Sequence, residues 1–309
     1  MFPVNLVILG RLTPLNPGFK NLHFARQSPS RLAPVRIILP PEDSHMQRRQ
    51  FLAASLATSA LALGRDSAAE PASSTSREYY QIRRYTLRQG PQAKLAESYF
   101  TDALIPALTR MSLGPIGAFQ GDIGADSPAF TLLIPGPSAE VLVRLDLRLA
   151  EDPVFLKAAE PFWSAPASAP AFERVETSLL LAFAGWPRLT PPASSATKTK
   201  RIFQLRTYES PSDRDHVRKV EMFNNGEFDV FKAAGFSLVF FGDTLIGPRM
   251  PCLTYMLSLP GLDELNARWD AFRTHPDWKK LSTDPRYAFE PIVSNITNLI
   301  LSPLACSQI

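Results

Sequence analysis

The sequence predicts an α+β fold in which one module occurs twice along a chain of 309 residues. Three features predict it. Short segments recur at an offset of about 123 residues, alternating apolar segments flank helical patterns, and a stretch rich in Pro, Ser, Thr and Ala separates the copies. We assign the first copy to residues 79–186, the linker to 187–200, the second copy to 201–304 and a C-terminal tail to 305–309.

The repeat is defined by matching segments that keep the same order in both copies. The pairs are residues 81–85 with 204–208, Phe100 with Phe223, Leu108 with Phe231, 121–122 with 242–243, 152–155 with 275–278, and 178–181 with 298–301. A single match of this kind arises by chance, whereas a series in order identifies two diverged copies.

Each copy predicts the same order of elements. Alternation predicts a first strand at 80–87 and at 202–208, and the helix that follows has apolar residues three or four positions apart. Two strands, a second helix and a last strand complete each copy. These later strands are expected at 116–120, 130–134 and 177–181 in the first copy and at 238–241, 252–258 and 296–301 in the second. The order βαββαβ is that of the ferredoxin-like fold.

The net charge of the chain lies in its first 76 residues. Eight of the 33 basic residues and four of the 29 acidic residues occur there, so 25 of each sign remain in residues 77–309. This balance removes the electrostatic argument for binding nucleic acid or an anionic membrane. We therefore expect no nucleic-acid partner.

Residues 46–76 have the pattern of a twin-arginine signal peptide. Arg48 and Arg49 precede an uncharged stretch rich in Ala and Leu that ends at Leu63, and small residues follow it. This stretch is too short to cross a bilayer, which takes about 20 apolar residues, so we expect no transmembrane segment. A short amphipathic helix is the alternative. The pattern predicts export to the periplasm.

Residues 1–45 precede this signal and contain no acidic residue before Glu42. That composition also suits a mitochondrial transit peptide, but seven prolines would break the amphipathic helix that such a peptide forms. We interpret residues 1–45 as the result of a start assigned upstream of Met46, or as a disordered segment.

Several segments resemble the NIPSNAP family, in a tandem form common among bacterial exported proteins. They are QLRTY at 204–208, FNNGE at 223–227, LTYML at 253–257, WDAF at 269–272, PDW at 276–278 and SNITN at 294–298. The resemblance covers nearly all of residues 79–309. The first copy departs from the pattern, with Leu104 where Glu227 stands and Asp146 where Trp269 stands. A site carried by those positions is therefore expected in the second copy alone.

The resemblance implies a dimeric α/β-barrel, in which two ferredoxin-like sheets face each other across a shared interior. Because both halves lie in one chain here, we expect two tandem ferredoxin-like modules that pack as an intramolecular dimeric α/β-barrel. Animal members of the family resemble mitochondrial adaptor or binding proteins, and relatives with this fold include cofactor-independent monooxygenases and heme enzymes. A fold shared by such different proteins assigns no reaction.

Searches for catalytic and metal-binding patterns exclude several kinds of site. After the leader only His216 and His275 remain, and no cluster of Cys and His has the spacing of metal ligands. The chain has no G-x-S-x-G, P-loop or dinucleotide fingerprint. We expect no metal and no cofactor, a loop or cap role for His275 before Pro276, and a solvated position on a helix for His216.

Arginine and tyrosine alternate along the first strand of each copy. Period-two alternation puts Arg206 and Tyr208 on one face, and Arg83 and Tyr85 on the matching face of the first copy. With Leu205 assigned to the helix side, we expect these four side chains in the interior between the sheets. An Arg there can bind an anionic or enol-like ligand through two hydrogen bonds, and a Tyr hydroxyl adds another. A stacked Arg–Tyr pair with a fixed structural partner is the alternative.

Glu227 lies on an apolar helix stripe, one turn from Phe223 and one turn from Phe231. A carboxylate at such a position is costly unless it is paired, and we expect it to be at least partly buried beside Arg206. As a functional group, Glu227 would act as an acid or base or would orient a ligand. As a structural group, it would be half of an ion pair.

Cys252 and Cys306 are the two cysteines of the chain. In a sheet of order 4-1-3-2, we place the end of the last strand and the start of the third at the same edge, where residues 302–305 could connect them. Export permits a disulfide there if the Cα atoms come within about 4.4–6.8 Å of each other. Two unpaired thiols are the alternative.

These features together predict an exported protein that binds a small molecule in the barrel interior. Two alternatives stay open: a cofactor-independent monooxygenase or isomerase in which Glu227 moves a proton, and a scaffold that meets a protein partner through its surface. A homo-oligomer and the identity of the ligand are also left open. An open interior favours the first two hypotheses, and a filled interior favours the scaffold.

Overall fold

Eight strands close into one barrel in the part of the chain that the structure, a computed structural model, describes: residues 76–124 and 128–309. Each strand is antiparallel to both of its neighbours, in the order β1-β3-β2-β8-β5-β7-β6-β4, and β4 pairs again with β1. The strands are β1 (Tyr79–Thr86), β2 (Gly117–Ile123), β3 (Ala129–Gly136), β4 (Arg174–Ala182), β5 (Ile202–Glu209), β6 (Ser237–Ile246), β7 (Cys252–Leu259) and β8 (Asn295–Pro303). The leader expected at 1–45 and 46–76 lies outside the described residues, apart from Ser76.

The first four strands and the last four form two contiguous halves of the barrel wall. Their orders around the wall are β4-β1-β3-β2 and β8-β5-β7-β6. The halves join twice: Gln120 of β2 lies opposite Ser302 of β8, and Leu181 of β4 lies opposite Asp243 of β6. Each half therefore covers both edge strands of the other half, and none of the eight described strands has an unpaired edge.

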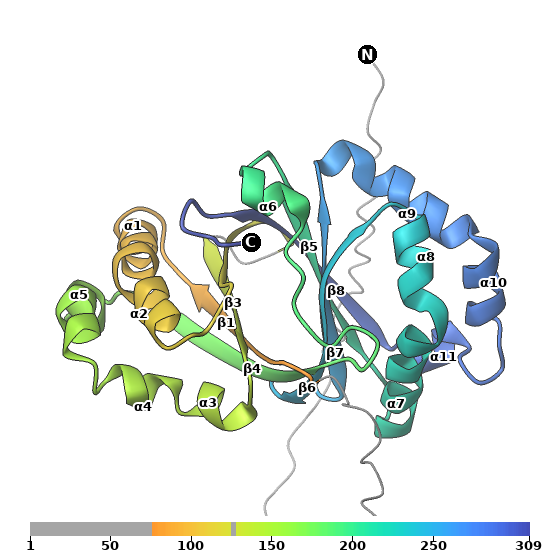
Figure 1. Cartoon of the computed structure of the whole chain (residues 1–309), viewed down its shortest axis with the longest axis horizontal. Helices are drawn as coiled ribbons and strands as arrows, with labels where there is room; N and C mark the ends of the chain where they lie inside the picture. Colours follow the sequence, from red (N-terminus) through yellow and green to blue (C-terminus); the bar gives the residue numbers. More distant parts are fainter. Residues whose placement is uncertain (1–75, 125–127) are drawn as a thin grey trace, which may run out of the picture. The chain divides into compact units, whose positions relative to one another are not determined.

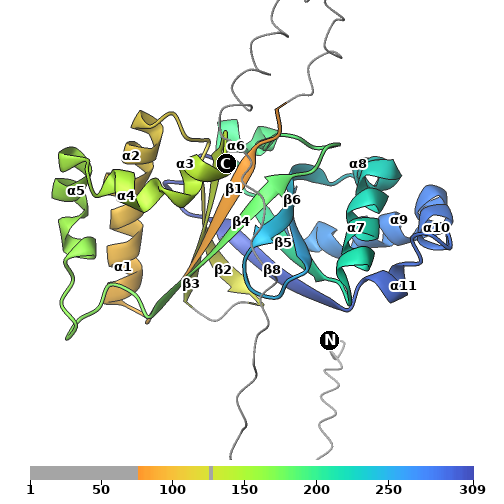
Figure 2. The same cartoon turned by 90° about the horizontal axis from the view of Figure 1, so that it is seen from below.

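Helices cover the outside of the barrel on two opposite flanks (Figures 1 and 2). The first half carries α1 (Pro91–Ser98), α2 (Ile105–Arg110), α3 (Ala139–Val143), α4 (Leu145–Leu149) and α5 (Pro153–Trp163). The second half carries α7 (Asp213–Met222), α8 (Phe228–Ala233), α9 (Leu265–Thr274), α10 (Pro276–Ser282) and α11 (Phe289–Ile292), and α6 (Ala193–Thr197) lies between the halves. Local sequence fixes the helix starts. Asp152 caps α5 because its carboxylate accepts hydrogen bonds from the backbone N–H groups of Val154 and Phe155. Ser212 caps α7 because its hydroxyl accepts a hydrogen bond from the backbone N–H of Asp215.

A π-helical turn interrupts the first helical segment of each half. One turn spans Tyr99–Leu104 between α1 and α2, and the other spans Phe223–Glu227 between α7 and α8. Within the second turn Gly226 has a φ of 136°, a conformation that favours glycine. A π turn holds more residues than an α-helical turn, so the residues after it are rotated around the helix axis.

The barrel interior is packed with apolar side chains to which every strand contributes. They include Tyr80, Phe119, Leu133, Leu180, Phe203, Leu205, Phe240, Met256 and Leu301. The rings of Phe119 and Phe203, one from each half, lie 4.8 Å apart between centroids. Two further apolar clusters fill the layers between the wall and the helices, one cluster in each half. The interior is thus largely filled, and both faces of the wall are buried.

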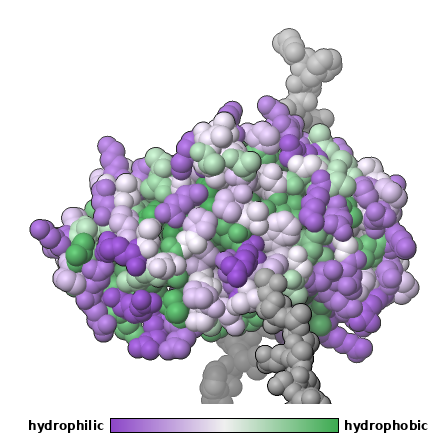
Figure 3. All heavy atoms as spheres, viewed as in Figure 1, coloured by the Kyte–Doolittle hydropathy of each residue, from purple (hydrophilic) through white to green (hydrophobic). Residues whose placement is uncertain are grey.

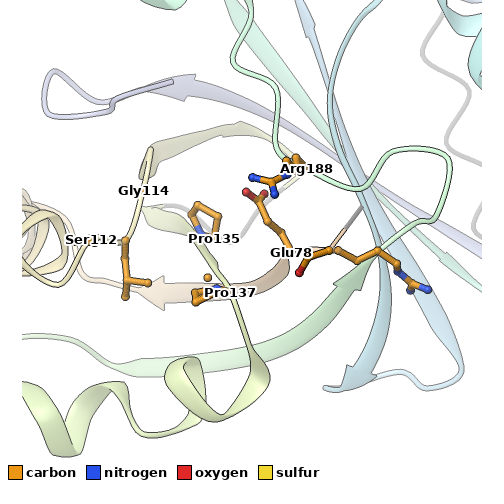
Figure 4. A pocket seen from close by; sticks show the side chains of 10 residues that line it. Glu78, Ser112, Gly114, Pro135, Pro137 and Arg188 are labelled. Carbon is orange, nitrogen blue, oxygen red and sulfur yellow. The ribbon is translucent and has the colours of Figure 1, made fainter. Parts of the chain in front are cut away.

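The segment between the halves packs against the start of β1. Glu78 donates its backbone N–H to the carbonyl of Pro187 at 2.9 Å, and its carboxylate accepts from the backbone of Leu189 at 2.8 Å. Figure 4 shows Glu78 and Arg188 pointing toward each other at a pocket of about 210 Å³ beside this contact. The start of the linker is therefore part of the folded unit.

The described surface is mixed in polarity. On the face in Figure 3, hydrophilic residues are spread over both flanks, with smaller apolar areas between them. Among the described residues, no helix has the length and apolar character that a membrane crossing needs.

All eight strands expected from alternation are present, and each half has the order strand, helices, two strands, helices, strand. The ends differ by a few residues for most strands. The largest difference is in β6, which continues to Ile246 because it pairs with β4 of the other half as well as with β7.

Candidate functional site

Arg206 and Tyr208 lie on the outer face of the barrel wall, beneath the helices, and not in the interior where we expected them. Tyr208 packs in the helix-side cluster of the second half, whereas Phe203 and Leu205 face the interior. The alternation along β5 is correct, but the assignment of its two faces is wrong. Both faces of this strand are buried, so hydrophobicity alone does not distinguish them.

The first half shows the same arrangement. Tyr85 belongs to the helix-side cluster, and Ile82 packs against the interior cluster. Arg83 lies on the Tyr85 side, next to Asp146 of α4. Four of the five predicted ligand-binding residues therefore come together in pairs, one pair under the helices of each half, and the two pairs are separated by the barrel.

Protein groups hold Arg206 of the second half. Its Nη1 donates to Asn298 Oδ1 at 2.8 Å, its Nη2 donates to the Tyr208 hydroxyl at 3.1 Å, and its Cζ lies 4.3 Å from the ring centroid of Trp269. The Tyr208 and Tyr255 hydroxyls are 2.8 Å apart. Burial raises the pKa of both tyrosines, so both stay protonated at neutral pH. This arrangement fixes the Arg206 side chain against the wall.

Glu227 is buried, as predicted, but its partner is Lys219 and not Arg206. The Lys219 Nζ donates to Glu227 Oε2 at 2.6 Å, and the two side chains are 0% and 1% exposed. The Lys219 Nζ also lies 4.4 Å from the centroid of the Phe223 ring. The π-helical turn brings Glu227 onto the face of Lys219, eight residues earlier, while Arg206 is held by Asn298.

Burial acts against the charges of both partners. It raises the pKa of Glu227, although Lys219 and Arg206 oppose the shift, and it lowers the pKa of Lys219, although Glu227 opposes that shift. At the equivalent positions the first half has Ala96 and Leu104, both fully buried. The same layer therefore packs in the first half without an ion pair at this place.

An open pocket of about 340 Å³ lies in the equivalent layer of the first half. Its walls are mainly aromatic, and they are formed by Tyr85, Tyr99, Phe162, Trp163 and Phe172. Tyr99 and Phe162 stack with ring centroids 4.0 Å apart. Trp163 and Phe172 are 39% and 37% exposed, so the rim presents large apolar rings to solvent.

Arg83 also lines this pocket and is 5% exposed. Its Nη1 donates to Asp146 Oδ1 at 2.8 Å, and its Nε donates to Gln81 Oε1 at 2.7 Å. The Asp146 side chain is 64% exposed, so this partner lies toward solvent. An entering ligand could therefore reach the guanidinium if the Asp146 carboxylate turned away.

Two tyrosine hydroxyls can act as donors in the same pocket. Burial raises the pKa of Tyr85 and of Tyr99, so both remain protonated at neutral pH. The Tyr99 oxygen accepts from Trp163 Nε1 at 3.1 Å, which leaves the Tyr99 proton available to another acceptor. Arg83, Tyr85 and Tyr99 thus form a group of donors among aromatic walls.

One substitution between the halves distinguishes the two layers. Trp269 stands where the first half has Asp146; it covers Arg206 and donates to Gln204 Oε1 at 2.8 Å. In the first half Asp146 leaves Arg83 in an open pocket. We expected a site at these positions in the second copy alone; the open pocket lies instead in the first half, and in the second half the bulky indole occupies the space above Arg206.

Of the two alternatives for Cys252 and Cys306, the structure has the two unpaired thiols and not the disulfide. Strands β7 and β8 are each antiparallel to β5, so they run parallel to each other. The start of β7 lies opposite Glu209, whereas the end of β8 approaches Phe203 at the other end of β5. Our placement of both strand ends at the same edge was therefore wrong.

The two histidines of the described part have structural roles. His275 caps α10, as predicted, by accepting a hydrogen bond from the backbone of Asp277 at 3.3 Å. His216 is buried and not solvated, with its Nε2 2.6 Å from Asp243 Oδ1. Among residues 76–124 and 128–309, no group of three or more His, Cys, Asp or Glu is placed to hold a metal ion.

Several residues of these layers were not singled out by sequence reasoning. Lys219 was missed because a spacing of eight residues does not align on a regular α-helix, and FNNGE was the only local sign of a π turn. Tyr99 and Trp163 were missed because aromatic residues in helices usually form core. The mismatch between Asp146 and Trp269 was the signal that could have located the pocket.

The barrel and its helix layers define the class of this protein as a mixed α/β fold with a closed, eight-stranded antiparallel barrel. Residues 202–308 match the family model of NIPSNAP. The chain therefore contains a NIPSNAP domain at residues 202–308, which include the last four strands of the barrel.

Solved structures of low sequence identity are similar to this chain over part or most of its length. A candidate monooxygenase from Lactobacillus acidophilus is 12% identical, with 74% of this chain and 94% of that chain covered and a TM-score of 0.49. A NIPSNAP-like domain protein from Burkholderia xenovorans is 17% identical over 34% of this chain and 86% of its own, with a TM-score of 0.31. A NIPSNAP family protein from Agrobacterium tumefaciens is 18% identical over 34% and 94%, with a TM-score of 0.30. No functionally curated protein matches the sequence.

Proposed function

We propose that the protein binds a small planar aromatic anion, such as an aromatic carboxylate or a phenolate, in the pocket of the first half. The observation that carries this proposal is the aromatic pocket above the buried Arg83. Partly exposed rings such as those of Trp163 and Phe172 favour a stacked planar ligand. A buried guanidinium favours a ligand with an anionic oxygen.

The pocket lining offers donors to an anionic ligand. Arg83 supplies charge and directional N–H groups, and the protonated hydroxyls of Tyr85 and Tyr99 supply neutral donors. The ligand would replace the Asp146 carboxylate at Arg83, and the exposed Asp146 would turn into solvent at little cost. A neutral aromatic molecule lacks the charge that compensates Arg83 after this exchange and should bind more weakly.

The volume of the pocket suits a ligand of one or two rings, because about 340 Å³ is near the lower limit of small-molecule sites. The second half supports the assignment to the first. There Trp269 lies on the guanidinium of Arg206 with its ring at 4.3 Å, as a ligand ring would lie over Arg83. We interpret the Trp269 ring as filling, between the wall and the helices of the second half, the space that a ligand ring would fill over Arg83 in the first half.

We also infer that the two halves are tandem ferredoxin-like modules which build, in one chain, the barrel that a dimeric α/β-barrel builds from two chains. Three features support this inference. Both halves have the same order of elements, the same strand order around the wall, and reciprocal joints at β2–β8 and β4–β6.

We further propose that the protein is exported to the periplasm. The support is the sequence of residues 46–76, in which Arg48 and Arg49 precede a short apolar stretch and small residues. An exported protein would meet the aromatic anion outside the cytoplasm.

Binding of 2-naphthoate to the full chain, measured by isothermal titration calorimetry, tests the function. Asp146→Trp copies the second half, should fill the pocket and should abolish binding. Arg83→Met should weaken binding by tenfold or more, because it removes a charge-assisted hydrogen bond. The matched control is Arg206→Met in the covered layer of the second half, which should leave binding unchanged.

The neutral 2-naphthamide separates stacking from recognition of the anion and should bind at least tenfold more weakly than 2-naphthoate. Unchanged 2-naphthoate binding by Asp146→Trp, or loss of binding by Arg206→Met alone, would overturn the assignment to the first half. The thermal unfolding midpoint of each variant shows whether a loss of binding reflects a loss of folding.

A further inference from the structure

Gln81 precedes Arg83 by two residues on β1, so both side chains lie on the same face of the wall. It is buried, and it is not among the described residues that line the pocket of the first half. Its Oε1 accepts from Arg83 Nε at 2.7 Å, and its Nε2 donates to the backbone carbonyl of Leu142 in α3 at 3.1 Å. Gln81 therefore connects the buried guanidinium to the helix layer.

These two partners fix the direction of the Gln81 amide. The Arg83 Nε–H can only donate and the Leu142 carbonyl can only accept, so the amide oxygen must face the guanidinium and the amide nitrogen must face α3. Leu142 is itself fully buried, and α3 packs so closely on β3 that a Cβ added at Gly136 would lie 2.8 Å from Leu142 Cδ2. The amide is thus anchored to a fixed part of the fold.

The contact with Gln81 determines how Arg83 meets the pocket. Its Nε is used by the amide, and it meets its carboxylate partner Asp146 through Nη1 at 2.8 Å. Asp146 also lines the pocket and is largely exposed, so Nη1 is directed to the side from which a ligand would enter. A ligand that takes this place replaces a carboxylate, and a second carboxylate offers Arg83 the same charge-assisted hydrogen bond.

The equivalent glutamine of the second half has a different role. The Gln204 Oε1 accepts from Trp269 Nε1 at 2.8 Å, and the Gln204 Nε2 donates to Asn298 Oδ1 at 3.1 Å. Arg206 is held by Asn298 and Tyr208 instead. The glutamine therefore fixes the covering indole in the second half, whereas it fixes the guanidinium in the first half, where an aspartate replaces the indole.

We propose that Gln81 is a positioning residue that gives the pocket of the first half its specificity for an aromatic carboxylate. This inference rests on the proposed function and narrows its ligand class from aromatic anions to carboxylates. The amide holds the Nε side of Arg83, so Nη1 reaches the ligand where the Asp146 carboxylate lies now. Because the amide is neutral, the charge of the guanidinium is left to the ligand. A buried carboxylate at position 81 would compensate that charge permanently.

Gln81→Met tests the positioning role in the full chain by titration calorimetry. Met keeps the length of the side chain and removes the acceptor for Arg83 Nε, so 2-naphthoate should bind about tenfold more weakly. Binding of the neutral 2-naphthamide should be unchanged. Equal weakening of both ligands would mean that Gln81 only supports the fold of the pocket and would overturn the inference. Gln204→Met in the second half is the matched control and should change neither affinity.

Gln81→Glu tests the role of the neutral amide. The new carboxylate should keep Arg83 in place and compensate its charge, so the preference for 2-naphthoate over 2-naphthamide should fall to about threefold or less. A preference as large as that of the wild type would overturn the claim that specificity depends on a neutral partner at position 81. The thermal unfolding midpoint shows that each variant is folded.

A pair of ligands with the same ring tests the narrowed class. At a pH at which both are ionised, 4-nitrobenzoate should bind the wild type more tightly than 4-nitrophenolate does, because only the former carries the group that Asp146 presents to Arg83. Equal or tighter binding of 4-nitrophenolate would overturn the assignment to carboxylates.

The Arg83 Nε–H signal in nuclear magnetic resonance spectra gives a measurement without ligand. In protein with isotope-labelled arginine, this signal is identified by its absence from Arg83→Met. Its hydrogen should exchange slowly in the wild type and in Gln204→Met, and faster in Gln81→Met, because only the last variant lacks the acceptor. Unchanged exchange in Gln81→Met would overturn the positioning role. Failure of the wild type to bind 2-naphthoate would refute the proposed function, and the exchange measurement would still decide whether Gln81 positions Arg83.

Discussion

The buried ion pair between Lys219 and Glu227 leads to a quantitative prediction about stability. The change is Lys219→Met and Glu227→Leu, each alone and both together. Leu is chosen because the first half carries Leu104 at the position of Glu227, and Met keeps most of the volume of the Lys219 stem. The measured quantity is the free energy of unfolding of each of the four proteins.

Each single substitution should lower the free energy of unfolding by about 3–5 kcal/mol, because it leaves one buried charge without its partner. The side chains are 0% and 1% exposed, so water cannot replace the missing partner without structural change. After Glu227→Leu the ammonium of Lys219 still faces the Phe223 ring at 4.4 Å, a contact that offsets part of the loss. We therefore expect Lys219→Met to be the more damaging of the two.

The double substitution should restore stability to within about 1 kcal/mol of the wild type, or exceed it, because it removes both desolvated charges together. The coupling between the two positions then amounts to roughly 6 kcal/mol or more, well above the usual 0.5–3 kcal/mol for residues in contact. Such a value would identify the pair as mutually dependent and as replaceable by apolar side chains.

Urea unfolding followed by circular dichroism supplies the four free energies. The exposed pair Arg286 and Glu221, with a separation of 2.8 Å, is the matched control and should show a much smaller coupling. Additive losses in the buried double variant would refute the reasoning, since additivity would mean that neither group depends on the other.

The same pair predicts a dependence on pH. Burial raises the pKa of Glu227 above its ordinary value of 4.5, so the folded state binds this proton more tightly than the unfolded chain does. Between pH 4.5 and the raised pKa, the contribution of Glu227 to the free energy of unfolding must therefore fall as the pH rises. The stability of the wild type relative to the double variant should therefore decrease from pH 4.5 upward, and a constant difference would contradict the raised pKa.

Changing both Arg48 and Arg49 to Lys should retain the protein in the cytoplasm, because the export receptor reads the arginine pair; cell fractionation measures this, and unimpaired export would contradict the signal. Gly235→Ala should lower the free energy of unfolding by about 1 kcal/mol, because Gly235 has a φ of 85° after α8. Gly261→Ala, at an extended position with open space around it, is the control in the same urea titration. Both cysteines should react with a thiol reagent in the unfolded, unreduced chain, and a single disulfide would contradict the free thiols.

The strands could be predicted from the sequence because alternation and the repeat reinforced each other. The faces of β1 and β5 could not, since the wall has apolar clusters on both sides. Leu205 therefore looked as suitable for the helix side as Tyr208. Choosing between the faces required knowing that the barrel closes and that the helices lie outside it.

The candidate site was harder to predict for two physical reasons. Burial of Glu227 followed from its apolar neighbours, but the identity of its partner depended on a π turn, which shifts the helix phase by an amount that α-helical spacing does not reveal. The pocket exists because no large side chain covers Arg83. The absence of a covering side chain cannot be read directly from a single sequence. Only the comparison of Asp146 with Trp269 carried that information.

The difference between Asp146 and Trp269 is one that a symmetric homodimer cannot have. When two identical chains form a barrel, every substitution appears twice, so a residue that closes one cavity closes both. Joining the halves in a single polypeptide removes this constraint. One layer can then gain rigidity from a large indole while the other stays accessible, so stability and recognition can be adjusted independently within the same barrel.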